Sequence, residues 1–486
     1  MNEEIKALEP KSLWNHFTDL NAVPRPSKKE ERVIAFIKAF GEGLGLETIV
    51  DHIGNVIIKK PASVGMEDRK TVVLQSHLDM VHQKNNDTQF DFDKEGIKMF
   101  VDGDWVKADG TTLGADNGIG VASIMALLSS VDIAHPAIEA LFTIDEETGM
   151  TGAQELKGGL LDGELLLNLD TEDDRELTIG CAGGIDISAS GTYEESDPSG
   201  NFQFFDLSVK GLTGGHSGMD IILGRANSNK IMNRVLMEVS ENMKLQISNI
   251  DGGGLRNAIP RESIAVFGVE KNKSQELKNY LNKILKELKH EYSTTDPDLV
   301  IEYNETQSPS KVLNSDFQSS ILKSIASCQN GIFRMSPDID GLVQTSNNLA
   351  RVLIQGGKYE ILCLTRSSVD SEKMELARSI KSAFELSGAD VNMDGSYPGW
   401  TPNPKSELVE IMADLYRKMH SAEPDVNACH AGLECGILGT NYPKIDMISF
   451  GPNIRGAHSP DEKVQISSVQ KYWEFLLETL KHIPKN

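Results

Sequence analysis

Runs of mostly apolar residues recur in the first third of the chain and once more near its end. Short runs of this kind, separated by segments that contain Gly and Pro, are typical of buried strands. They cover residues 56–58, 72–78, 138–144, 165–169 and 445–450. Apolar residues at helical spacing occur over residues 33–40, 121–128, 408–419 and 469–480. Before the first of these stretches, Ser27-Lys28-Lys29-Glu30 has capping-box spacing. The alternation predicts an α/β fold, with a mostly parallel sheet flanked by helices.

The composition is that of an ordinary globular protein, with 39% hydrophobic and 25% charged residues. At 486 residues the chain is long for a single core, so two or three domains are expected. The net charge of −24 argues against nucleic acid or an anionic membrane as a partner, but it does not repel a divalent cation.

Several features predict a cytoplasmic protein. The first residues, Met1 to Lys6, are acidic and lack the apolar segment of an export signal. No run approaches the length of about 18 apolar residues that a membrane-spanning helix needs. The five cysteines are scattered without C-x-x-C spacing, so neither a disulfide framework nor a thiolate zinc site is expected.

The run over residues 72–78 ends in a histidine and an acid. On a strand, residues i and i+2 point to the same side, so His77 and Asp79 share one face. A carboxylate that holds the second ring nitrogen is the usual way to orient a metal-binding imidazole. A purely structural His–Asp pair explains this spacing equally well.

A glycine-rich loop, residues 109–120, precedes the helix predicted from about Val121. Such loops can bind phosphate, but no Gly-Lys-Ser/Thr follows, and Asp116 would repel an anion. We therefore interpret the loop as a tight turn that presents Asp116 to a cation. The alternative is that Asp116 or Asn117 simply caps the helix.

The other strand ends carry acids and a histidine. Glu146 and Glu147 follow the strand over residues 138–144, Asp170 follows 165–169, and His458 lies shortly after 445–450. Ligands of open α/β sheets collect at the carboxyl ends of the strands. With His77 and Asp116, these residues suit zinc, with cobalt or manganese possible, and five ligands fit two metals about 3.5–4 Å apart with a bridging carboxylate. A solvated acidic turn is the alternative for Glu146 and Glu147.

Five motifs carry a resemblance that covers essentially the whole chain. They are Ser76-His77-Leu78-Asp79-Met80, Gly114-Ala115-Asp116-Asn117-Gly118, Asp145-Glu146-Glu147-Thr148-Gly149, Asn168-Leu169-Asp170 and Gly456-Ala457-His458-Ser459-Pro460. They resemble the motifs of the di-zinc aminoacylase/carboxypeptidase metallopeptidases. The resemblance implies that His77 and Asp170 hold one metal, that Glu147 and His458 hold the other, and that Asp116 bridges them. It also implies that Asp79 orients His77 and that Glu146 is the general base.

The same resemblance implies a catalytic domain over residues 1–184 and 397–486 and an inserted lid domain over residues 185–396. Within the lid, a strand–helix–strand–helix order over residues 202–288 recurs over residues 299–384, at an offset of about 90–100 residues, which predicts a duplicated α/β unit. A doubled lid permits a monomer, while the resemblance also allows a homodimer.

Four further residues gain roles from the resemblance. His216, in a glycine-flanked loop, would stabilise the oxyanion, Asn257 would support substrate binding, and Arg366 would bind the substrate carboxylate. Glu434 would contact the substrate amino group. Without the resemblance, a surface or turn residue is the favoured interpretation of His216, Asn257 and Arg366, and a structural turn explains Glu434 equally well.

The expected function is metal-dependent hydrolysis of unblocked dipeptides, with preference for Xaa-His substrates such as β-alanyl-histidine. Two alternatives are an amino-acid deacylase or tripeptidase of the same fold and a non-catalytic module that binds metal or carboxylate. The intact Glu146 beside a full ligand set speaks against the second alternative, as does the missing export signal.

Overall fold

The computed structural model describes residues 2–486, which divide into two compact units. The first unit comprises the chain up to Gly180 together with Trp400–Ala428 and Leu433–Asn486. The second unit comprises Cys181–Gly399 and the short segment Cys429–Gly432. The main boundaries lie a few residues from those predicted, whereas no sequence feature indicated that Cys429–Gly432 joins the second unit.

The main sheet of the first unit has eight strands in the order β1-β2-β6-β3-β7-β23-β8-β22. The four central strands, β6, β3, β7 and β23, run parallel, and β1, β2 and β8 add antiparallel edges. The strands are β1 (Glu47–Val50), β2 (Val56–Lys60), β3 (Val72–His77), β6 (Ile138–Thr143), β7 (Leu165–Asn168), β8 (Glu176–Cys181), β22 (Asp425–Cys429) and β23 (Asp446–Ser449). The parallel centre confirms the predicted α/β fold.

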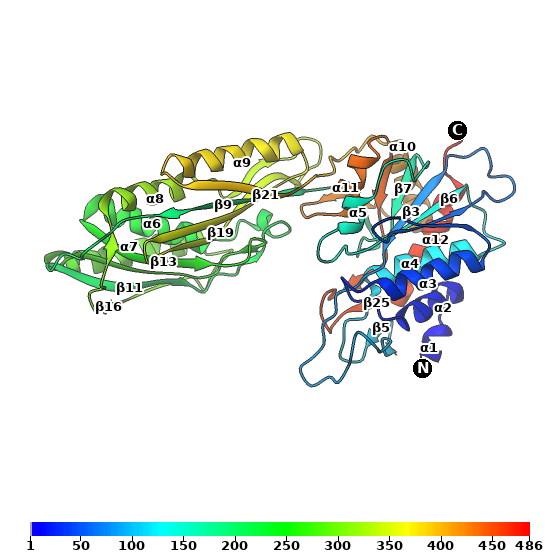
Figure 1. Ribbon diagram of the computed structural model, residues 1–486, viewed down its shortest axis with the longest axis horizontal. Coiled ribbons are helices and arrows are strands. Elements are labelled where there is room, and N and C mark those ends of the chain that lie inside the picture. The colour runs from blue at the N-terminus through cyan, green and yellow to red at the C-terminus, as the bar shows by residue number, and fades with distance from the viewer. Residues whose placement is uncertain (1) are drawn as a thin grey trace. The chain divides into compact units, whose positions relative to one another are not determined.

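Helices cover both faces of this sheet (Figure 1). On one face, Val73 and Leu141 pack with Ala153 and Leu438, which come from α5 (Thr151–Glu155) and α11 (Glu434–Asn441). Helix α4 lies against β3 and α2. The remaining helices of this unit are α1 (Glu3–Lys6), α2 (Lys11–Asn21), α3 (Glu31–Gly43), α4 (Ala115–Ser129), α10 (Glu407–His420) and α12 (Ile466–Lys481).

Two helix starts differ from prediction. Helix α3 begins after Glu30, and Ser27 donates its hydroxyl to the Met80 carbonyl instead of capping the helix, so the capping-box prediction is wrong. Helix α4 begins at Ala115 rather than near Val121, although Asp116 and Asn117 keep non-helical dihedral angles. The predicted turn at Asp116 is thus built into the first turn of the helix.

A small sheet in the order β24-β25-β5-β4 completes the first unit. Its strands are β4 (Met99–Asp102), β5 (Trp105–Ala108), β24 (Ile454–Arg455) and β25 (Lys463–Gln465). Antiparallel pairing of β24 with β25 closes the loop that carries His458.

The second unit is a sheet in the order β16-β11-β15-β13-β19-β20-β9-β21, with β18 paired to β19. The four α-helices of this unit lie along one face of the sheet (Figure 1). The strands are β9 (Gly183–Thr192), β11 (Phe202–Lys210), β13 (Leu245–Gly253), β15 (Ser263–Glu270), β16 (Val300–Thr306), β18 (Gly331–Met335), β19 (Val343–Gln355), β20 (Lys358–Ser367) and β21 (Asp390–Tyr397). The helices are α6 (Ser228–Asn242), α7 (Ser274–Glu291), α8 (Ser315–Ser327) and α9 (Asp370–Glu385). Shorter elements are β10 (Glu195–Ser196), β12 (Gly215–His216), β14 (Ala258–Ile259), β17 (Val312–Leu313), η1 (Ile221–Leu223) and η2 (Lys271–Lys273).

The second unit has two halves with the same topology. The strand order β16-β11-β15-β13 is mirrored by β21-β9-β20-β19, and the halves join where β13 pairs with β19. The predicted duplication therefore exists, but its halves are assigned differently. The segment predicted to open the second half is β16, which closes the first half, and β9 takes the opening position.

Among residues 2–486, none of the helices combines the length and the apolar character needed to span a membrane.

Candidate metal centre and catalytic site

His77 lies at the carboxyl end of β3 and is fully buried. Its Nε2 is 3.1 Å from Asp116 Oδ1 and 3.6 Å from Asp170 Oδ1. Its Nδ1 is 3.1 Å from the backbone oxygen of Asp79 and 3.4 Å from the Asp79 carboxylate. Burial disfavours the charged ring, but Asp170 and Asp116 raise the His77 pKa well above its ordinary value. The ring nitrogen that faces the site is therefore held among anions.

Asp79 positions both the histidine and the neighbouring loop. Its two carboxylate oxygens accept hydrogen bonds from the backbone N–H groups of Glu146 at 3.0 Å and Glu147 at 3.3 Å. Burial opposes ionisation, yet the contact with His77 and these N–H groups hold the Asp79 pKa below its ordinary value. One ionised carboxylate thus fixes His77 and the Glu146–Glu147 segment relative to each other.

Asp116 lies between the two histidines. Its Oδ1 faces His77, and its Oδ2 is 3.3 Å from Nε2 of His458, which is also 2.9 Å from Glu147 Oε2. Burial opposes ionisation of Asp116, but both histidines hold its pKa far below the ordinary range. Two sets, His77–Asp116–Asp170 and Asp116–Glu147–His458, each bring their ligand atoms within 4.8 Å of one another. Because Asp116 belongs to both sets, the arrangement can hold two cations bridged by one carboxylate.

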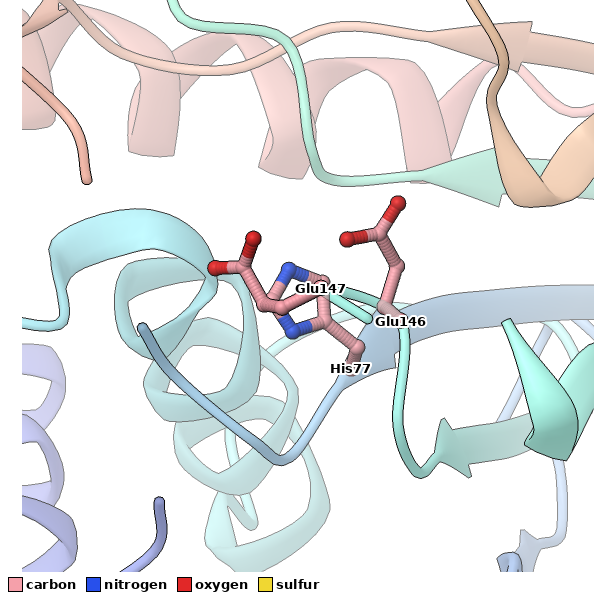
Figure 2. A group of neighbouring side chains, drawn as sticks. All are labelled: His77, Glu146 and Glu147. Atoms are coloured by element: carbon pink, nitrogen blue, oxygen red, sulfur yellow. The ribbon is translucent and has the colours of Figure 1, made fainter. Parts of the chain in front are cut away.

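Glu146 joins this centre from the loop after β6. Figure 2 shows Glu146 and Glu147 beside His77, and ligand atoms of the three residues lie within 4.8 Å of one another. Burial raises the Glu146 pKa well above its ordinary value, and nearby carboxylates, including Asp170, add to this effect. A carboxylate in this environment can accept and return a proton closer to neutral pH than a solvated one.

Glu434, the first residue of α11, is buried in the same unit. Its Oε2 accepts hydrogen bonds from Gln75 at 2.6 Å and Thr143 at 2.7 Å, and Asn168 in turn holds Gln75. Within residues 2–486, its Oε1 is buried without a hydrogen-bond partner. Burial raises the Glu434 pKa to about 7. One oxygen is therefore fixed by the sheet, and the other is left to meet a donor from outside the chain.

Arg366, on β20 of the second unit, is only 5% exposed. Its guanidinium donates to the Tyr397 hydroxyl at 2.8 Å and to Ser217 Oγ at 3.5 Å. Within residues 2–486, no carboxylate lies within 4.0 Å of its nitrogens. A buried guanidinium with only neutral partners is suited to bind an anion.

His216 and Asn257 lie on neighbouring segments of the second unit, because β12 pairs with β14. Nδ1 of His216 accepts the backbone N–H groups of Gly218 and Met219, so the ring proton resides on Nε2. Burial and the charge of Arg366 lower the His216 pKa, which favours the neutral ring. Asn257 accepts the Ser217 N–H with its backbone oxygen at 2.7 Å, and its side chain is exposed.

Three further buried polar residues were not predicted from the sequence. His430, from the short segment that joins the second unit, is 6% exposed and lies 2.8 Å from Ser346 Oγ. Arg25 is fully buried and donates to the carbonyls of Leu78, Asp79 and Gly114. Glu462 accepts hydrogen bonds from the backbone of the Asp116 loop. Of the three, Glu462 lies two residues after the motif that ends at Pro460.

Strand ends of a mixed α/β fold that gather histidines and carboxylates in this way form a candidate metal centre. The comparisons with known proteins make this specific. The family model described as peptidase family M20/M25/M40 matches residues 73–482. The chain is 41% identical to the cytosol non-specific dipeptidase of Escherichia coli (strain K12) over 481 residues, which cover 99% of each chain.

Solved structures agree with this result. The crystal structure of aminoacylhistidine dipeptidase from Vibrio alginolyticus matches with a TM-score of 0.95 and 42% identity, covering 100% of this chain and 99% of the other. Aminopeptidase PepT from Bacillus cereus, at 16% identity, a TM-score of 0.57 and coverage of 98% and 99%, shares the fold. The chain belongs to peptidase family M20/M25/M40 and is a peptide-hydrolysing enzyme.

The buried His430 makes stability depend on pH. Burial lowers its pKa from 6.5 to about 3, and the positive charge of Arg366 contributes. Because the folded-state pKa lies below the unfolded-state value, the stability is present above pH 6.5 and is lost as the pH falls towards 3. Between pH 7 and pH 5, wild type should lose about 2 kcal/mol more free energy of unfolding than His430→Gln, measured by urea unfolding. Equal losses in the two proteins would contradict this assignment.

Proposed function

We propose that the chain is a metallo-dipeptidase that hydrolyses unblocked dipeptides and prefers Xaa-His substrates such as β-alanyl-histidine. The observation that carries the proposal is the pair of ligand sets that share Asp116, with Glu146 beside them. The names of the two relatives above 40% identity, a cytosol non-specific dipeptidase and an aminoacylhistidine dipeptidase, support the substrate class. The E. coli name also supports action in the cytoplasm, while a homodimer stays a prediction.

In this proposal, His77, Asp116 and Asp170 would hold one divalent metal, and Asp116, Glu147 and His458 would hold the second. The donors are imidazole nitrogens and carboxylate oxygens, which suit zinc and also accept cobalt or manganese. Two such ions, when bound, polarise the scissile carbonyl and acidify water. The donor set of the described residues fits this cofactor.

The acid–base work falls to Glu146. Its carboxylate accepts the proton of the attacking water and later delivers it to the leaving amine. Its pKa, which burial raises above the ordinary value, favours uptake of the proton from the water. Asp79 keeps Glu146 in place through the hydrogen bond to its backbone N–H.

The remaining side chains act on the rest of the substrate. His216 donates its Nε2–H to the oxyanion that forms during attack, a role that its neutral state supports. Arg366 binds the carboxylate of the substrate, and Asn257 supports substrate binding. Oε1 of Glu434, which has no hydrogen-bond partner within residues 2–486, accepts a hydrogen bond from the free amino group. An amino-acid deacylase has an acylated substrate that offers Glu434 no charged amine, which favours the dipeptidase over that alternative.

The direct test is release of histidine from β-alanyl-histidine, measured before and after metal removal. Protein loaded with zinc should release histidine, and chelator-treated protein should not until metal is restored. A panel of acylated amino acids and tripeptides serves as the comparison. Release from the tripeptides or acylated substrates alone, with metal bound, would overturn the dipeptidase assignment in favour of a sibling activity.

Glu146→Gln should lose turnover while keeping both metals. The amide retains the size of the side chain but cannot take up the proton of the attacking water, so kcat should fall about 10²–10⁴-fold. Metal content and kcat are measured on the same preparation. Glu147→Gln is the matched control and should lose metal as well as activity. Near-normal turnover in Glu146→Gln would remove Glu146 as the base.

Arg366→Ala should raise KM for free dipeptides much more than for the same dipeptides with amidated C-termini. The reason is that only the free substrate presents the carboxylate that the guanidinium would bind. Arg366→Lys keeps the charge but not the planar fork and should lie between wild type and Arg366→Ala. An equal rise in KM for both substrate sets would exclude the carboxylate-binding role.

A further inference from the structure

We propose that Glu462 is a positioning residue that sets the metal subsite formed by Asp116, Glu147 and His458. The inference rests on the proposed two-metal function and assigns a role to a residue outside both ligand sets. Glu462 is only 2% exposed and immediately precedes β25. Its carboxylate does not belong to the clusters that could hold a cation among the described residues.

The evidence is a convergence of backbone groups on one carboxylate. Glu462 Oε2 accepts hydrogen bonds from the N–H groups of Leu113 at 2.7 Å and Gly114 at 3.0 Å. Its Oε1 accepts those of Ala115 at 2.7 Å and Asp116 at 3.3 Å. The first N–H groups of a helix have no acceptor within the helix, and the start of α4 has its acceptor in this side chain. A negative charge is also favoured at this end of a helix.

The same residue belongs to the loop that carries His458. Within this loop the Glu462 N–H donates to the Ser459 carbonyl at 3.0 Å, and Ser459 donates to the Gly456 carbonyl. The pairing of β24 with β25 closes the loop at its base. Glu462 therefore joins the segment that carries His458 to the segment that carries Asp116.

These two segments contribute two of the three residues of one metal subsite. His458 Nε2 lies 3.3 Å from Asp116 Oδ2. Glu462 links the two segments that carry these atoms. The other subsite is held differently, since His77 ends β3 and Asp170 follows β7 and accepts a hydrogen bond from Asn117. Loss of the Glu462 contacts should therefore weaken the two subsites unequally.

The test is a titration of metal-free protein with Zn²⁺, followed by calorimetry and by metal content after dialysis. Wild type should take up two equivalents. In Glu462→Gln, an amide NH₂ replaces one oxygen and faces backbone donors. One equivalent should therefore bind about 10–100-fold more weakly, and the other should be weakened less, because the shared Asp116 is its only residue on a segment that Glu462 holds. Glu462→Asp keeps both oxygens but withdraws them by one methylene. It replaces Glu462→Gln as the test variant if the latter does not fold, and it should show the same selective weakening of one equivalent.

Glu139→Gln is the matched control. Glu139 is 3% exposed, lies on β6 of the same unit, and accepts the backbone N–H groups of Asp162 at 2.8 Å and Gly163 at 2.9 Å. It should keep both equivalents at wild-type affinity. Wild-type binding of both ions by Glu462→Gln, or equal weakening of both, would overturn the positioning role. Failure of wild type to bind two ions would instead count against the proposed two-metal function.

Discussion

The first unit depends on how it accommodates several carboxylates at one edge of its sheet. Asp79, Glu434 and Glu462 are buried, and Asp116 and Asp170 both face His77. Carboxylates removed from water lose their hydration and repel one another more strongly than they would at the surface. Each must therefore be compensated by hydrogen-bond donors or by positive charge, and the surrounding loops are shaped by that requirement.

Backbone N–H groups provide much of this compensation. Asp79 accepts two of them from Glu146 and Glu147, and Glu462 accepts four from the start of α4. Arg25 donates hydrogen bonds to backbone carbonyls of the same region. They are those of Leu78 and Asp79, which follow β3, and that of Gly114. Polar groups of the main chain thus fix the carboxylates in position. The negative charge that remains is what makes the centre suitable for divalent cations.

The positions of the candidate site residues at strand ends could be predicted from the sequence. His77 and Asp170 each follow or end a dense apolar run, and parallel pairing of β3 with β7 brings those ends to one edge of the sheet. Arg25 and Glu462 could not be predicted in this way. Their partners are backbone groups of distant segments, and a contact with a backbone group requires no particular residue type at the other end.

The second unit shows a similar limit in its strands. The sequence predicted the strands β11, β15, β16 and β20 and all four helices, but it did not predict β9, β13, β18, β19 or β21. Strands β9, β13 and β21 contain Gly, Asn or Asp, which are depleted in strands, so their place in the sheet depends on pairing with neighbours as well as on local preference. The assignment of the two halves was wrong because β9, whose buried Ile185, Ile187 and Ala189 alternate with polar residues, was not recognised as the opening strand of the second half.

Each unit contains a buried ionisable side chain that keeps a capacity to bind a ligand. Glu434 in the first unit leaves one carboxylate oxygen without a partner among the described residues. Arg366 in the second unit is a buried cation whose hydrogen-bond partners are the neutral Tyr397 and Ser217, and the lowered pKa of His430 keeps that ring neutral beside it. A buried charged or unsatisfied polar group is costly, so each of these two side chains is suited to bind a ligand of opposite charge.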